Sequence, residues 1–91
     1  MMRFEWDEAK NAASIRKHGI DFSDAIEVFD HPMLTMIDDG EDYGEERWLG
    51  VGLMQGRTIV VIYVERDGDR IRLISARKAT RHEVRRYEQR R

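Results

Sequence analysis

The sequence predicts an α+β fold: a small, mainly antiparallel sheet with two N-terminal helices on one face and a short C-terminal helix. Three observations predict it. Helical patterns fill most of the first third of the chain, several strand-like runs follow one another, and a last helical pattern comes near the end. Helices that precede a meander of strands are typical of α+β domains, in which they pack on one sheet face. With 91 residues, the chain is expected to form a single domain over residues 1–91.

The first elements are a strand at residues 3–6, where aromatic and polar side chains alternate, and a helix at residues 8–18. Asp7 is expected to cap this helix and Gly19 to end it. A helical wheel separates an apolar side of the helix from a polar one. The apolar arc holds Ala9, Ala12, Ala13 and Ile15, and the polar arc holds Lys10, Ser14 and Lys17.

A second, shorter helix is expected at residues 24–30, with Ser23 as its N-cap and Pro32 just beyond its end. Its apolar face would consist of Ala25, Ile26, Val28 and Phe29.

Four strands are expected after the helices. Residues 33–37 read as a strand and residues 38–46 as an acidic, solvated loop. Residues 47–53 alternate, which places Leu49, Val51 and Leu53 on one face and Trp48, Gly50 and Gly52 on the other.

The two remaining strands and the last helix are joined by short turns. Residues 58–65 form a nearly continuous apolar strand, which indicates cover on both faces. The Asp-Gly pair within residues 66–69 predicts a tight hairpin into a last strand at residues 70–76. Thr80 and Glu83 have the spacing of a capping box, which opens a short basic helix.

Charge is divided unequally along the chain. Residues 1–65 hold six Lys and Arg against fourteen Asp and Glu, a net charge of −8, and residues 66–91 hold ten against four, a net charge of +6. Such asymmetry indicates a localised basic surface of the kind that binds phosphate, although a charged terminal helix that keeps a small domain soluble has the same pattern.

Other classes of protein are disfavoured by composition. The chain has no cysteine, so disulfides and cysteine-based zinc sites are impossible. Its longest apolar run, residues 59–64, is far shorter than the about 20 residues that span a bilayer. The first ten residues turn acidic at once and lack a secretory signal core. These observations predict a soluble cytoplasmic protein with no membrane contact.

Three segments together resemble one known family. They are "FEWDEAK…RKHGIDFSDA" near the start, "YGEERW" in the middle and "RIRLISARKATRHEVRRYE" at the end. In order and spacing they are similar to the BrnT toxins, the toxin half of a bacterial type II toxin–antitoxin pair, across residues 4–88. The sequence departs from the family pattern at Ser14, where an Asn is expected.

The resemblance implies a RelE-like fold and an RNA-cleaving activity that stops translation. It also implies a cognate antitoxin with a ribbon-helix-helix module, which neutralises the toxin. The complex of the two would repress their own operon, so the toxin would meet operator DNA only through the antitoxin.

Metal-free RNA cleavage uses the substrate's own 2′-hydroxyl as nucleophile, so the protein must hold the phosphate, balance its charge and move two protons. Arg72 and Arg77 are the leading candidates for the phosphate clamp, because a guanidinium donates to phosphate through a planar fork. Their positions have opposite parity, so they share a sheet face only if a bulge intervenes or the strand ends early. Alternatively, Arg72 protects an edge strand and Arg77 pairs with a carboxylate.

Lys17 and His18 are further catalytic candidates at the end of the first helix. Histidine has the unperturbed pKa nearest physiological pH and can take or give a proton, but a His before a C-terminal Gly also serves to complete a helix end. Lys10 shares a side with Lys17, and the pair would form a cationic ridge for the RNA backbone or simply a solvated face.

Glu83 is a candidate general base, although the capping box with Thr80 accounts for it fully. Trp48 is a candidate for stacking on an unpaired base, although core packing under a helix is the more common role of such a residue. Charged contacts with RNA are also expected from Arg66, Lys78 and Arg81.

No metal site and no cofactor are predicted, because the acidic loop lacks the ligand spacing of a calcium loop and no histidines are paired at helical spacing. The cationic side chains of the last strand and helix are expected to converge on one concavity beside Lys17. The alternative function is a non-catalytic module that binds nucleic acid or a protein through its basic C-terminal segment.

Overall fold

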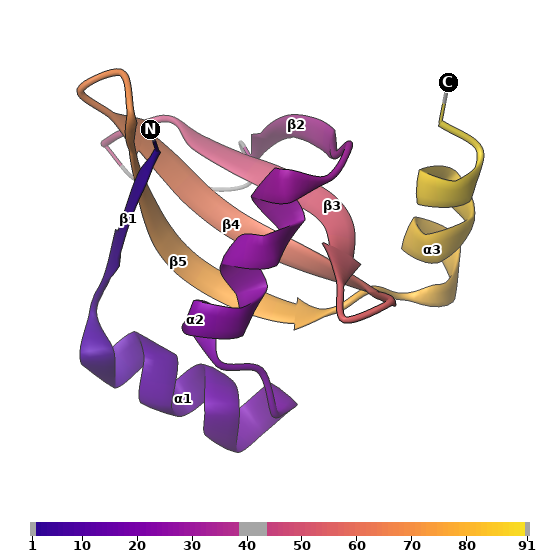
Figure 1. Ribbon diagram of the computed structural model, residues 1–91, viewed down its shortest axis with the longest axis horizontal. Coiled ribbons are helices and arrows are strands. Elements are labelled where there is room, and N and C mark those ends of the chain that lie inside the picture. The colour runs from indigo at the N-terminus through magenta and orange to yellow at the C-terminus, as the bar shows by residue number, and fades with distance from the viewer. Residues whose placement is uncertain (1, 39–43, 91) are drawn as a thin grey trace.

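The computed structural model describes residues 2–38 and 44–90, and its elements follow the predicted order (Figure 1). In chain order they are β1 (Arg3–Trp6), α1 (Glu8–His18), α2 (Phe22–Ala25), the 3₁₀ helix η1 (Ile26–Asp30), β2 (Leu34–Asp38), β3 (Arg47–Met54), β4 (Arg57–Arg66), β5 (Arg70–Lys78) and α3 (Arg81–Glu88).

The five strands form one sheet in the order β1-β5-β4-β3-β2. β1 runs parallel to β5, and the other neighbouring strands are antiparallel. The predicted α+β class and the mainly antiparallel sheet are therefore confirmed. Most of the predicted acidic loop, residues 38–46, lies outside the described residues. No helix in the described part of the chain is long and apolar enough to cross a membrane.

The sheet has a separate apolar cluster on each face. α2 and η1 cover one face, where Phe22, Val28 and Leu73 are fully buried. On the other face Tyr87 of α3 packs with Val51 and Val60. The alternation predicted along residues 47–53 is confirmed: Leu49, Val51 and Leu53 belong to the α3 side, whereas Trp48 packs on the α2 side and Cβ atoms at Gly50 and Gly52 would meet Met33 and Val28.

Two tight hairpins fix the register of the central strands. Gln55 and Gly56 join β3 to β4, and residues 67–69 join β4 to β5. Gln55, Gly56, Asp67 and Gly68 all have positive φ angles. Consecutive positive φ angles are typical of the type I′ turn, whose twist matches that of the strands it connects. The predicted Asp-Gly hairpin is confirmed.

The cap predicted for the second helix is wrong by two residues. Asp21, not Ser23, is the N-cap of α2, and its carboxylate accepts hydrogen bonds from the backbone N–H and the hydroxyl of Ser23. The helix starts earlier because Asn11 of α1 holds this turn, donating to Asp21 (3.2 Å) and accepting from the Phe22 N–H (2.8 Å).

The side of α1 that faces the protein is polar rather than apolar. Ile15 is 46% exposed, whereas Asn11 and Ser14 are only 8% and 6% exposed. The predicted caps, Asp7 and Gly19, are confirmed. The apolar arc nevertheless faces solvent, because α1 packs beside the edge of β5, where backbone groups need polar partners.

That edge is open because β1 is short. β1 pairs with residues 70–73 of β5 and no further, and α1 lies alongside the remainder (Figure 1). The Ser14 hydroxyl lies 2.7 Å from the Ile20 carbonyl oxygen and 3.3 Å from that of Ala76 on β5. Ser14 therefore ties the helix both to its following loop and to the strand.

A β-bulge interrupts β5 where α1 approaches. Leu73 pairs with Tyr63 and Ser75 pairs with Ile62, which leaves Ile74 as an extra residue. The bulge reverses the parity of the strand, so that Leu73 and Ala76 both join the core on the α2 side. Arg72 and Arg77 were expected to share a sheet face only if a bulge lay between them, and this bulge does.

Candidate nucleic-acid interface

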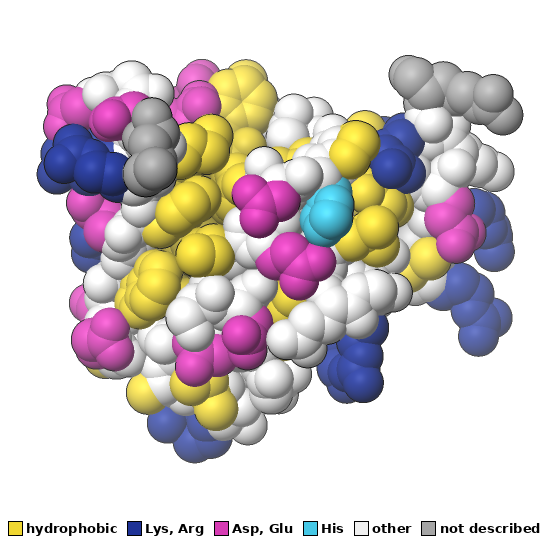
Figure 2. All heavy atoms as spheres, viewed as in Figure 1, with side chains coloured by type: hydrophobic (Ala, Val, Ile, Leu, Met, Phe, Trp, Pro, Cys, Tyr) yellow, Lys and Arg dark blue, Asp and Glu magenta, His cyan; other side chains and the backbone are white. Residues whose placement is uncertain are grey.

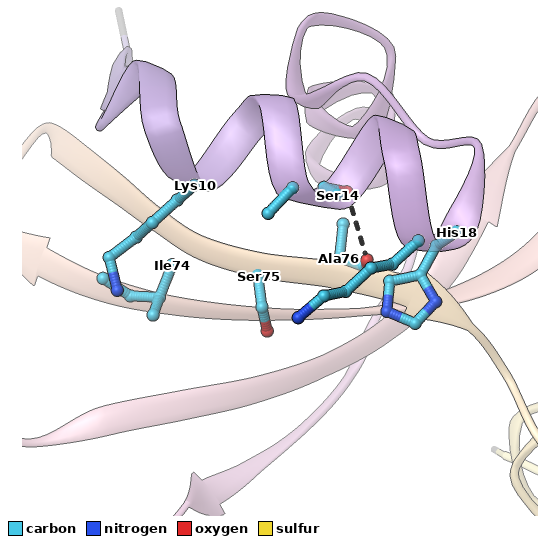
Figure 3. Close-up of a pocket in the computed structure, with 8 residues that line it drawn as sticks. Lys10, Ser14, His18, Ile74, Ser75 and Ala76 are labelled. Carbon is cyan, nitrogen blue, oxygen red and sulfur yellow. Dashed lines mark hydrogen bonds between the residues drawn. The ribbon is translucent and has the colours of Figure 1, made fainter.

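A pocket of about 180 Å³ lies between α1 and the bulged part of β5. We call it the α1–β5 groove. Figure 3 shows Lys10 and His18 flanking it from different turns of α1, with Ser14 between them and Ser75 on the strand. Its lining consists of Lys10, Ala13, Ser14, Lys17, His18, Ile74, Ser75 and Ala76.

The electrostatic character of the α1–β5 groove is cationic. Lys10 and Lys17 are exposed, and their side chains make no hydrogen bond or ion pair with another described residue. No carboxylate is among the described residues that line the groove. Two ammonium groups at one pocket, with an imidazole and the Ser75 hydroxyl beside them, provide donors for an anion such as a phosphodiester.

The helical spacing of α1 brings the two lysines and His18 to the same pocket. Residues 10, 14 and 17 lie three and four positions apart, so their side chains share one side of the helix, as predicted. His18 follows at the last helical position, and Gly19 ends the helix in the left-handed conformation. The cations of this last turn also complement the negative end of the helix dipole, so they have a structural as well as a functional use.

Arg77 does not line the α1–β5 groove; it forms a two-pronged ion pair with Glu83. Its Nη1 and Nη2 atoms lie 2.8 and 2.9 Å from the two Glu83 carboxylate oxygens. Glu83 also completes the predicted capping box with Thr80. The Arg77 hydrogen bonds lower the pKa of Glu83 from 4.5 to about 2, with a smaller contribution from the Thr80 N–H. A carboxylate with so low a pKa is a weak proton acceptor.

Arg72 is paired as well, 3.1 Å from a carboxylate oxygen of Glu5 on β1. The bulge does place Arg72 and Arg77 on the same sheet face, but they are five positions apart along the strand, roughly 15 Å. The expectation that the cations of the last strand and helix converge on one concavity beside Lys17 is therefore wrong. Carboxylates on β1 and α3 engage these two arginines separately, and the lysines of α1 line the groove instead.

The other predicted RNA contacts are scattered. Trp48 is partly buried against the core on the α2 side, Arg66 pairs with Glu45 at 2.9 Å, and Arg81 is exposed in the first turn of α3. Lys78, at the end of β5, lines a second pocket that also contains His18. Of these four residues, Lys78 alone adjoins the α1–β5 groove.

The centre of the α2 face is acidic. Figure 2 shows several acidic side chains near the centre of this view, beside a hydrophobic area, and the basic side chains at its margins. The carboxylates of α2 and η1 and their flanks belong to Asp21, Asp24, Glu27 and Asp30. This distribution disfavours passage of RNA across α2 and favours its approach along the edge where α1 meets β5.

Comparisons with known proteins support both the fold and the family resemblance of the three quoted segments. Residues 6–83 match the model of a family described as the ribonuclease toxin BrnT of type II toxin–antitoxin systems. The chain belongs to the BrnT family. It is thus a member of a family of ribonuclease toxins, as the sequence resemblance indicated.

A solved structure gives the same result. The chain is similar to the crystal structure of the Brucella abortus ribonuclease toxin, BrnT, with 29% sequence identity and a TM-score of 0.67. The similarity covers 89% of this chain and 100% of the Brucella chain. No curated protein matches the sequence.

Sequence reasoning missed three residues near the pockets of this toxin. Ser75 enters the groove through the bulge, and no local pattern announces a bulge at that position. Arg57 lines the pocket that also contains Lys78, from the first position of β4. His82 lines a third pocket, of about 130 Å³, between α3 and the apolar side chains of β2 and β3. The sequence places His82 beside Glu83 in a predicted helix, but it does not indicate that this helix faces β2 and β3.

The Arg77–Glu83 pair should make the toxin's stability depend on pH. Because the folded-state pKa of Glu83 is lowered from 4.5 to about 2, the pair's contribution is full above about pH 4.5 and is lost as the pH falls towards about 2. We expect Glu83→Gln, which can still cap α3, to lower the free energy of unfolding by about 1 kcal/mol at pH 7. This deficit should shrink between pH 4.5 and 2, as measured by urea denaturation at several pH values.

Glu88→Gln is the matched control, because it removes an exposed carboxylate from the same helix. It should change stability little, and by a similar amount throughout the range. A Glu83→Gln deficit that stays constant from pH 7 to pH 2 would contradict the account.

Proposed function

We propose that this toxin cleaves RNA without a metal ion, by attack of a 2′-hydroxyl on the neighbouring phosphorus, and that the α1–β5 groove holds the scissile phosphate. The observation that supports the proposal best is the pairing pattern of the cations. Lys10 and Lys17 have no carboxylate partner among the described residues, whereas Arg72 and Arg77 do.

The reaction forms a bond between the 2′-oxygen and phosphorus and breaks the bond between phosphorus and the 5′-oxygen. One proton leaves the 2′-hydroxyl and another reaches the departing 5′-oxygen. Lys10 and Lys17 stabilise the additional negative charge on the phosphoryl oxygens. His18, at one end of the groove, takes or gives a proton, and Ser75 donates a hydrogen bond to a phosphoryl oxygen.

The donor set explains why no metal is invoked in this proposal. Ammonium, imidazole and hydroxyl groups line the groove, and an ammonium group attracts anions and repels divalent cations. The charge balance that a metal ion supplies to phosphoryl chemistry is here assigned to the two lysines.

The biological setting follows from family membership. A toxin of a type II pair requires an antitoxin protein, and we propose that its cognate antitoxin carries a ribbon-helix-helix module. The proposed pair acts in the bacterial cytoplasm, where cleavage of RNA stops translation. Operator DNA is contacted by the antitoxin within the complex and not by the toxin alone.

Incubation of the purified toxin with RNA in excess chelator tests the chemistry. We expect cleavage to continue and to leave a 2′,3′-cyclic phosphate on one product and a 5′-hydroxyl on the other. Lys17→Ala removes an ammonium group from the scissile phosphate and should slow single-turnover cleavage about 100-fold. Expression of this variant without antitoxin should no longer arrest bacterial growth.

Arg16→Ala is the matched control for Lys17→Ala. Arg16 is an exposed cation one residue away on the same helix, and it does not line the groove. The Arg16→Ala variant should cleave RNA at a rate within about threefold of that of the unmodified toxin, since surface charges away from the substrate act only through long-range attraction. If Lys17→Ala and Arg16→Ala lose the same activity, or if the chelator abolishes cleavage, the proposal is wrong.

The role of His18 is tested by the pH dependence of cleavage. His18→Gln can still form hydrogen bonds but does not titrate near neutral pH. We expect a rate about 100-fold lower and a pH–rate profile that lacks one limb of the profile of the unmodified toxin. A variant with a slower rate but both limbs intact would show that His18 only completes the end of α1.

A further inference from the structure

A second pocket, of about 210 Å³, adjoins the α1–β5 groove and shares His18 with it. It lies beyond the C-terminal end of α1, against the β3–β4 turn and the last residue of β5. Its lining consists of His18, Gly19, Ile20, Asp24, Met54, Gln55, Arg57, Ile59 and Lys78.

The sheet register places the two cations of this pocket side by side. Lys78 pairs with Ile59 across the β4–β5 ladder, and Arg57 precedes Ile59 by two residues on β4. Residues two apart on a strand share a face, so Arg57 and Lys78 are diagonal neighbours on the α2 side of the sheet. The β3–β4 hairpin, with positive φ angles at Gln55 and Gly56, fixes the position of Arg57.

Both cations are available to a ligand. Arg57 and Lys78 are exposed and form no ion pair with another described residue, although the carboxylate of Asp24 lines the same pocket. Asp24 offsets part of the charge, and two permanent cations against one carboxylate leave the pocket positive. The pocket therefore attracts an anion, and His18 of α1 is the residue that it shares with the proposed catalytic groove.

The two pockets form one continuous cationic path. Along it lie Lys10, Lys17, His18, Lys78 and Arg57, contributed by α1, by the end of β5 and by the start of β4. A positively charged groove that follows the backbone is the usual way in which proteins hold single-stranded nucleic acid. The acidic centre of the α2 face borders this path and would repel a strand that left it.

We propose that the pocket of Arg57 and Lys78 is a second phosphate subsite, which holds the phosphate next to the scissile one in a single-stranded RNA. The inference rests on the proposed function of the α1–β5 groove and adds a substrate requirement. The toxin needs a charged phosphate on one defined side of the cleaved bond. His18 lines both pockets, so it lies where the RNA strand would pass from one subsite to the other.

A substrate with one neutral linkage tests this subsite directly. A methylphosphonate replaces a charged phosphoryl oxygen by a methyl group, and it can be placed at the linkage on either side of the cleaved one. For the unmodified toxin we expect single-turnover kcat/KM to fall about tenfold with the neutral linkage on one side and hardly at all with it on the other. For the Arg57→Ala, Lys78→Ala double variant, the neutral linkage should cause no further loss.

Salt dependence gives a second readout with the same variants. For single-stranded RNA the logarithm of the affinity falls with the logarithm of the salt concentration with a slope of about −0.7 per phosphate contact. The double variant should have a shallower slope by about one contact. Arg16→Ala and Arg85→Ala, which remove exposed cations from α1 and α3 outside both pockets, should leave the slope unchanged.

The possible failures are distinguishable. If the neutral linkage lowers kcat/KM of the double variant as much as that of the unmodified toxin, the proposal of a second subsite is wrong, whatever the activity of Lys17→Ala. If Arg85→Ala alone reduces the slope, the RNA follows α3 and the subsite is again wrong. If Lys17→Ala cleaves normally while the double variant loses its sensitivity to the linkage, the α1–β5 groove is wrong as the catalytic centre and the subsite remains as a binding site.

Discussion

The structure depends on the open edge of β5 beyond Leu73. β1 is only four residues long, so the backbone groups of β5 past that point need other partners. α1 packs beside this edge, and the hydroxyl of its Ser14 lies between the carbonyls of Ile20 and Ala76. The same contact holds the lysine side of the helix beside the strand, so the architecture that closes the edge also creates the groove.

Ion pairing separates the cations of this toxin into two groups. Arg72 and Arg77 are paired with Glu5 and Glu83, and these pairs join β1 and α3 to the last strand. The lysines of α1 have no such partner in the part of the chain that the structure describes. An excess of arginine near the C-terminus is therefore a poor guide to the proposed phosphate site, because Arg72 and Arg77 pair with carboxylates of other elements.

Local signals predicted most of the fold. Asp7, Gly19, the Asp-Gly hairpin and the Thr80 capping box act over a few residues, so the sequence alone indicates where those elements begin and end. The errors arose where distant segments meet. Asn11 moves the start of α2 to Asp21, the strand edge reverses the expected apolar side of α1, and carboxylates from β1 and α3 hold apart arginines that were expected to converge.

We propose that RNA lies against α1 and the bulged half of β5. Backbone amide NMR shifts, recorded as the toxin is titrated with an oligonucleotide that lacks the attacking 2′-hydroxyl, measure this directly. We expect the largest shifts in residues 10–19 and 74–78. Shifts confined to α3 and to the facing strands β2 and β3, with α1 unchanged, would contradict it.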